Sequence, residues 1–143
     1  MSLNFFSPKP GRFGVQPVVI SRRLNTGTLS AGTLTFNLAG LPRKAVISGI
    51  TYSATTYPDA STVTAQLIKR DVSAAADVNI TAAADVDNKT AQSGINVALL
   101  TTLTNAQQLL DTNDTLKVSL ATSGTVTTQP VDLTVTVELL LLN

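Results

Sequence analysis

The stretch Val131-Asp132-Leu133-Thr134-Val135-Thr136-Val137-Glu138-Leu139 decides the fold class of this chain. Its odd-numbered residues are all apolar, and its even-numbered residues are all polar. Successive side chains of a β-strand point to opposite faces, so this pattern predicts a strand with one face on a core and the other in water. Strands of this kind are typical of antiparallel sheets that have one solvated face.

Seven further segments extend the same interpretation along the chain. Residues 115–120 and 33–38 alternate as clearly, and residues 45–54, 62–70, 78–82 and 95–100 do so more weakly, while 15–24 form a less regular extended stretch. Turn-forming residues separate them, at Asn25-Thr26-Gly27, Gly40-Leu41-Pro42, Tyr57-Pro58-Asp59, Ser93-Gly94, Asp111-Thr112-Asn113-Asp114 and Ser123-Gly124. One short helical candidate covers residues 105–110. The pattern predicts an all-β, antiparallel two-sheet sandwich, best matched by an eight-stranded jelly roll, in a single domain over residues 15–143.

Composition agrees with a sheet protein of low charge. Charged residues make up 13% of the chain, against roughly 25% in typical soluble domains. Abundant Thr and Val favour extended backbone because their branched Cβ atoms pack well on a pleated surface. No secretory signal is visible, and the longest apolar run, Leu139 to Leu142, is far shorter than the ~20 residues of a membrane span. We therefore expect a soluble protein made without export.

Charge is distributed unevenly along the chain. Residues 1–70 carry eight Lys and Arg against one Asp, whereas residues 71–143 carry two Lys against eight Asp and Glu. One interpretation is a pair of oppositely charged faces that let like subunits pack head to tail. The alternative is that the sandwich interleaves the two halves, so that the asymmetry disappears in space.

Residues 1–14 are predicted to form an extended N-terminal arm. Three of the four Phe residues (Phe5, Phe6 and Phe13) fall here, together with Pro8 and Pro10, which exclude a central strand. Burying one Phe releases about 2–3 kcal/mol, so these side chains are expected to cover an apolar surface. That surface belongs either to the domain itself or to a neighbouring subunit.

The sequence lacks the residues on which most enzymes depend. It contains no His and no Cys, which excludes the commonest general base, thiol nucleophiles, and zinc sites built on either residue. No phosphate-binding glycine loop or serine-hydrolase motif is present. Paired carboxylates occur, at Asp71/Asp77, Asp85/Asp87 and Asp111/Asp114. We interpret them as turn and loop residues, and we expect no enzymatic activity, cofactor or metal.

Sugar and nucleic-acid recognition have weak support. Trp is absent; Tyr52 has the apolar parity of its strand and is expected in the core, which leaves Tyr57 as an isolated stacking platform. Paired cations stand at three predicted strand ends, where we expect them to solvate a rim: Arg22-Arg23, Arg43-Lys44 and Lys69-Arg70. Without interleaved aromatic residues they do not indicate a nucleic-acid site.

The segments 44–52, 62–67 and 114–120, followed by Pro130 and the alternating terminal strand, resemble small virion proteins of tailed bacteriophages. In particular they resemble head decoration, or cement, proteins with a jelly-roll body. The resemblance implies a homo-oligomer, with a trimer favoured, that is made in the host cytoplasm and binds the major capsid protein on the capsid exterior. It implies no membrane, nucleic-acid or small-molecule partner. The residues expected to make these protein contacts are Phe5, Phe6, Lys9, Arg12, Phe13, Arg22, Arg23, Arg43 and Lys44.

Two other functions are compatible with the same sequence. A tail, baseplate or head-fibre adaptor would have the same fold and differ in its place in the virion. A glycan-binding adhesin module, from a different class, would depend on Tyr57.

Overall fold

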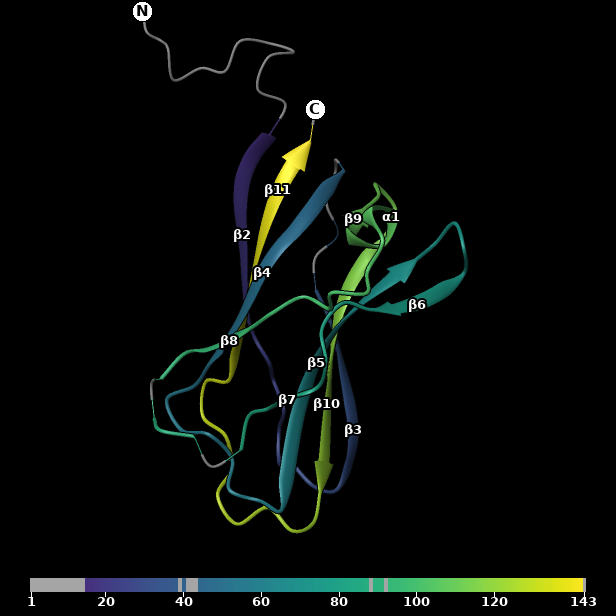
Figure 1. Cartoon of the computed structure of the whole chain (residues 1–143). Coiled ribbons are helices and arrows are strands. Elements are labelled where there is room, and N and C mark those ends of the chain that lie inside the picture. Colours follow the sequence, from purple (N-terminus) through teal and green to yellow (C-terminus); the bar gives the residue numbers. More distant parts are fainter. Residues whose placement is uncertain (1–14, 39, 41–43, 88, 92, 143) are drawn as a thin grey trace, which may run out of the picture.

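Two antiparallel β-sheets face each other in the computed structural model of this chain (Figure 1). The structure describes residues 15–38, 40, 44–87, 89–91 and 93–142. The expected arm, residues 1–14, and Arg43 therefore lie outside the described residues.

The first sheet contains both the first and the last described strand. Its order is β2 (Val15–Arg23), β11 (Thr134–Leu142), β4 (Ala45–Ser53) and β8 (Ile95–Val97), with β9 (Leu109–Leu110) also paired to β4.

The second sheet is built around β10 and β5. Its order is β3 (Gly32–Asn37), β10 (Thr115–Ser123), β5 (Thr62–Asp71) and β6 (Ala76–Asn79), and β7 (Ala84–Asp85) also pairs with β5.

The strand order follows a simple rule when the two-residue strands β7 and β9 are set aside. The remaining eight, counted along the chain, lie in the orders first-eighth-third-sixth and second-seventh-fourth-fifth. All but one of their connections cross from one sheet to the other, the exception being the β5–β6 hairpin. This order is the arrangement of a jelly roll, a sandwich of two sheets built from Greek keys. The predicted all-β sandwich is confirmed.

Alternation determines which side chains fill the space between the sheets. In β11, Val135, Val137 and Leu139 are buried, as the sequence pattern predicted. The core contributed by the other long strands consists of Ile47, Ile50 and Tyr52 from β4, Val63, Ala65 and Leu67 from β5, and Leu116, Val118 and Leu120 from β10. Each fully buried Val, Leu or Ile among them contributes about 1.5–3 kcal/mol by leaving water.

The boundaries of the last strand differ from the prediction at both ends. β11 was expected over residues 131–139 and instead runs from Thr134 to Leu142. Asp132 has a φ of 55°, which interrupts extended backbone, and Val131 makes only an isolated bridge to Thr56. The helical candidate is confirmed as a single turn, α1 (Asn105–Gln108), which Thr104 and Gln107 close with a capping box.

The two halves of the chain are interleaved. β10 lies between β3 and β5, and β11 lies between β2 and β4, so each central strand from the acidic half is flanked by strands from the basic half. Ion pairs join the halves at Arg23–Asp132 (2.9 Å), Lys44–Asp111 (3.9 Å) and Arg70–Asp77 (3.4 Å). These contacts favour the interpretation in which the charge asymmetry disappears in space.

The position of Lys69 differs from the prediction. The sequence predicted Lys69 and Arg70 on a solvated rim, whereas Lys69 is 1% exposed and points into the sandwich. Its ammonium donates hydrogen bonds to the carbonyl oxygens of Ala106 (3.2 Å) and Leu109 (2.8 Å). It also lies 4.0 Å from carboxylate oxygens of Asp71 and Asp114. The physical reason is strand parity, since Lys69 follows Val63, Ala65 and Leu67 on the inward face of β5.

Candidate assembly interface

A row of four apolar side chains crosses the outer face of the first sheet. Leu140 in β11 is paired with Pro17 in β2 on one side and with Val46 in β4 on the other, and Val46 is paired with Leu109 in β9. Paired residues share a face of the sheet, and the neighbours of this row, Leu139 and Leu141, face the core. We call Pro17, Leu140, Val46 and Leu109 the apolar row. Pro17 is exposed and the other three are half-buried.

The surroundings enlarge this apolar surface at one end of the sheet. Leu142, two residues beyond Leu140 and thus on the same face, is half-buried, and Val19 in β2 is 61% exposed. Glu138 is the partner of Val19 and lies between it and Gly49, so one carboxylate stands directly beside the apolar row.

The other outer surfaces of the two sheets are mainly polar in the described residues, with Ile68 in β5 as an apolar exception. At the opposite end of the same face, Ser21 and Thr136 are hydrogen-bonded to each other (3.2 Å), as are Thr51 and Asn96 (2.8 Å). The outer face of the second sheet carries mainly hydroxyl, amide and charged side chains, from Thr33, Thr35 and Asn37 in β3, Thr64, Gln66 and Arg70 in β5, and Lys117 and Ser119 in β10. The apolar row is therefore a local feature and not a general property of this surface.

A β-bulge in β4 aligns the row. Glu138 is paired with Gly49 and Leu139 with Ile47, which leaves Ser48 as the extra residue, and the Ser48 hydroxyl donates to the carbonyl oxygen of Glu138 (3.1 Å). The bulge changes the parity of β4, because Val46 faces outward while Ile50, an even number of residues away, faces the core.

The sequence signal for this surface was the loss of alternation at the end of the chain. From Leu139 to Leu142 every residue is Leu, so both faces of β11 become apolar there. The run is far shorter than the ~20 residues of a membrane span, so its length gave no indication of a binding surface. Among the described residues, no helix is both long enough and apolar enough to cross a membrane.

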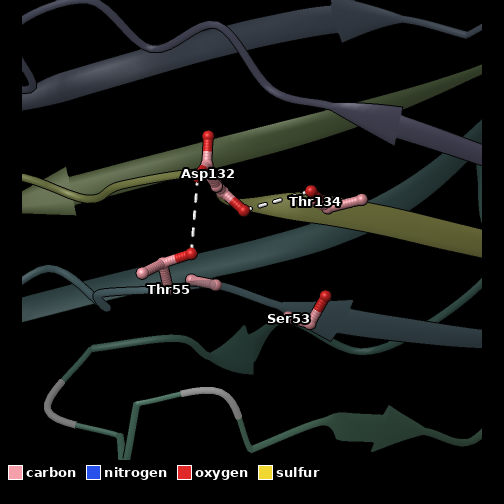
Figure 2. A pocket seen from close by; sticks show the side chains of 5 residues that line it. Ser53, Thr55, Asp132 and Thr134 are labelled. Atoms are coloured by element: carbon pink, nitrogen blue, oxygen red, sulfur yellow. Dashed lines mark hydrogen bonds between the residues drawn. The ribbon is translucent and has the colours of Figure 1, made fainter.

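A shallow hollow lies at the polar end of the same sheet (Figure 2). It has a volume of about 370 Å³ and is lined by Ser53, Ala54, Thr55, Asp132 and Thr134. The Asp132 carboxylate accepts hydrogen bonds from Arg23 (2.9 Å) and Thr55 (3.4 Å), and the Asp132 carbonyl oxygen accepts one from Thr134 (3.0 Å). These contacts give Asp132 protein partners within its own chain, which does not favour a ligand site.

The predicted contact residues are not brought together in the part of the chain that the structure describes. Arg22 and Arg23 end β2 beside the polar end of the first sheet, whereas Lys44 precedes β4 at the other end. Arg23 and Lys44 are paired with acidic side chains, and Arg22 is exposed. The other six predicted residues, Phe5, Phe6, Lys9, Arg12, Phe13 and Arg43, lie outside the described residues.

The structure weakens the glycan-binding alternative. Tyr57 is 4% exposed, and its hydroxyl donates a hydrogen bond to the carbonyl oxygen of Ser93. Burial raises the pKa of this hydroxyl. Tyr52 is fully buried, as expected, and burial raises its pKa as well. Neither ring is placed to stack on a sugar.

The paired carboxylates are only partly the turn and loop residues that we predicted, because Asp71 ends β5 and Asp77 and Asp85 lie in β6 and β7. Asp114 accepts hydrogen bonds from the backbone N–H groups of Val72 (3.0 Å) and Asp111 (3.0 Å). Asp71 accepts from the Ala74 N–H (3.0 Å) and the Ser73 hydroxyl (2.8 Å), and these hydrogen bonds lower its pKa. Within the described ranges, no group of three or more acidic residues is placed to hold a metal ion.

The fold and the apolar row define a jelly-roll sandwich with a candidate protein-binding face. No protein-family model matches the chain, and no curated protein matches it either. A solved structure does match, and it is a chain of the capsid asymmetric unit of cyanophage Pam1. The match has a TM-score of 0.53 and 21% sequence identity, and it covers 93% of this chain and 91% of the cyanophage chain. The two chains share a fold over nearly their whole lengths.

Proposed function

We propose that this chain is a structural protein of a bacteriophage virion, and that it decorates the outside of the capsid. The observation that carries the proposal is the end-to-end likeness to a chain of the cyanophage Pam1 capsid asymmetric unit. The likeness covers 93% of this chain and 91% of the cyanophage chain, so it is not confined to one part of either. Fold alone does not determine function, so a feature of the surface must also indicate protein binding.

The apolar row is such a feature. Exposed apolar surface that is gathered in one place on an otherwise polar protein is typical of sites where proteins bind one another. Here four strands contribute to it, and Val19 adds a side chain that is 61% exposed. A rigid sheet face of this kind can bind a partner without the entropy cost of ordering a loop.

In the proposed role the protein is not an enzyme. It binds the major capsid protein and other copies of itself, with a trimer favoured, and bridges neighbouring capsomers on the capsid exterior. Its contribution is mechanical, since each added contact between capsomers must be broken before the shell can open.

Immunogold labelling of virions with an antibody raised against the purified protein tests its location. Decoration predicts gold on the head. A tail, baseplate or head-fibre adaptor predicts gold at the tail or at the neck, and that result would overturn decoration. Absence of the protein from purified virions would overturn the virion role altogether.

Variants of the two outer faces test the binding surface. Val19→Asp places a charge beside the apolar row, and Thr35→Asp is a matched control on β3, which is likewise an edge strand. We expect Val19→Asp to lower the amount of protein retained on heads by about tenfold, which corresponds to ~1.4 kcal/mol of binding free energy. Thr35→Asp is expected to be retained normally. Equal retention of the two variants would contradict the use of this face.

A further inference from the structure

We propose that the apolar row receives residues 1–14 from a second copy of this chain. That the segment comes from a second copy rests on the proposed assembly role. That the segment is residues 1–14 rests on where it joins the sandwich, which residues it contains and how far it can reach.

The position of Val15 connects the segment to this end of the sheet. Val15 is paired with Leu142 at the first position of β2, and Pro17 of the apolar row follows two residues later. The N-terminal segment therefore joins the body next to the apolar surface and far from the polar end, where Arg23 is paired with Thr134. Copies that associate around this end of the sandwich bring one copy's segment close to another copy's row.

The chemistry of the segment complements the surface. Phe5, Phe6 and Phe13 are apolar side chains without an alternating strand to bury them, and the row offers Leu and Val side chains. Lys9 and Arg12 are both cationic. Glu138 is exposed beside the row, and no ion pair joins it to another residue in the described ranges.

The lengths are also compatible. The row crosses four neighbouring strands, which at about 4.8 Å between strands is a distance near 14 Å. Nine extended residues, from Phe5 to Phe13, span up to about 30 Å. Pro8 and Pro10 fix their own φ and favour extended backbone in the residues before them, Ser7 and Lys9. Such a stretch is better suited to crossing to a neighbour than to reversing onto its own sheet.

Disulfide trapping tests the proposal directly, because the chain contains no Cys. Phe6→Cys is made in one copy and Val46→Cys in a second copy that carries an affinity tag, so that a mixed dimer has its own mobility on a non-reducing gel. The two proteins are mixed and oxidised in the absence of capsids. We expect the yield of mixed dimer to be about fivefold higher than that of a control pair, Phe6→Cys with Thr35→Cys. The reason is that a disulfide forms only where the two Cα atoms approach within about 7 Å.

Further variants guard against misfolding and separate the possible results. Val19→Cys replaces a 61% exposed side chain next to the row and should give the same enrichment with Phe6→Cys. Glu138→Lys should lower the yield of either mixed dimer severalfold. A yield equal to that of the control pair would overturn the proposal. A Phe6→Cys/Val46→Cys double variant that closes within one chain at high dilution would also overturn it, since the segment would then cover its own row.

The two proposals fail separately. If gold labels the head but no mixed dimer forms, the decoration role stands and the use of residues 1–14 falls. If the mixed dimer forms but gold is absent from the head, self-association stands and decoration falls.

Discussion

The Lys69 ammonium lies beneath the loop that carries α1 and β9, and replacing Lys69 by methionine tests how much this buried cation stabilises the fold. Methionine keeps a long, unbranched side chain and removes the charge. In the native protein the ammonium donates to the carbonyl oxygens of Ala106 and Leu109 and lies 4.0 Å from Asp114, which is 4% exposed.

The expected loss follows from these contacts. A hydrogen bond made by a charged group contributes about 1.5–3 kcal/mol, and removing one partner of a buried ion pair costs ~3–5 kcal/mol. Two effects reduce the loss. Methionine is an apolar side chain at a buried position, and the Asp114 carboxylate keeps its two backbone N–H donors. We expect Lys69→Met to lower the free energy of unfolding by about 3–4 kcal/mol.

Urea unfolding, followed by circular dichroism, measures this change. With a slope near 2 kcal/mol per molar urea, the midpoint should fall by about 1.5–2 M. Lys89→Met, which replaces an exposed lysine, is the matched control and should change the free energy by less than about 0.5 kcal/mol. A loss below ~1 kcal/mol for Lys69→Met would refute the reasoning, because the ammonium would then contribute little beyond its own desolvation cost.

Three further predictions test other parts of the fold. Gly124 has a φ of 79°, and a Cβ there would lie 2.2 Å from the Ser61 hydroxyl oxygen, so Gly124→Ala should lower the thermal midpoint and cost about 2 kcal/mol; an unchanged midpoint would contradict this. The buried Tyr52 hydroxyl has no hydrogen-bond partner among the described residues, so Tyr52→Phe should raise the free energy of unfolding by about 1 kcal/mol, and a loss of that size would show that the hydroxyl is satisfied. Hydrogen bonding and charge from Lys117 lower the pKa of Asp77 below its ordinary value of 3.8. The stabilisation is therefore complete above that value and is lost as the pH falls through the lower folded-state pKa. Between about pH 6 and pH 2, the free energy of unfolding should fall less in Asp77→Asn than in the native protein. Equal decreases would exclude the contact between Asp77 and Lys117 as a cause of the acid-induced loss.

Strand parity carried most of the fold prediction, because one buried face per strand imposes a period of two on the sequence. It succeeded where the pattern was regular, as at Val135 and Val137, which are both fully buried. Parity also indicates an inward position for Lys69, in phase with Val63, Ala65 and Leu67, although its charge and its neighbour Arg70 favoured a solvated rim. Two strands of two residues each, β7 and β9, were missed because two residues are too few to show a period. The positive φ of Asp132 was missed because such a conformation depends on the contacts of the surrounding loops.

The candidate surface was harder to predict than the fold. A row across four strands is made of residues that are far apart in the sequence, and Pro17 and Leu109 become neighbours of Leu140 and Val46 only through pairing and register. The sequence does show a run of leucines, but not which of them face outward. The residues predicted to make contacts were chosen by charge and aromatic character, and those that the structure describes stand at opposite ends of the sheet.

The bulge at Ser48 affects how β4 aligns with the last strand, β11. Four consecutive leucines specify neither face of a strand, so the end of β11 would pair equally well after a slip of one residue. The information that prevents the slip lies in β11 itself, where Val135 and Val137 face the core in phase with Leu139 and Leu141. The bulge in β4 absorbs Ser48, so that Ile47 is paired with Leu139. Deleting Ser48 would place Ile47 directly before Gly49, so the same residue pairs could form without a bulge, and Leu139 and Leu141 should still face the core.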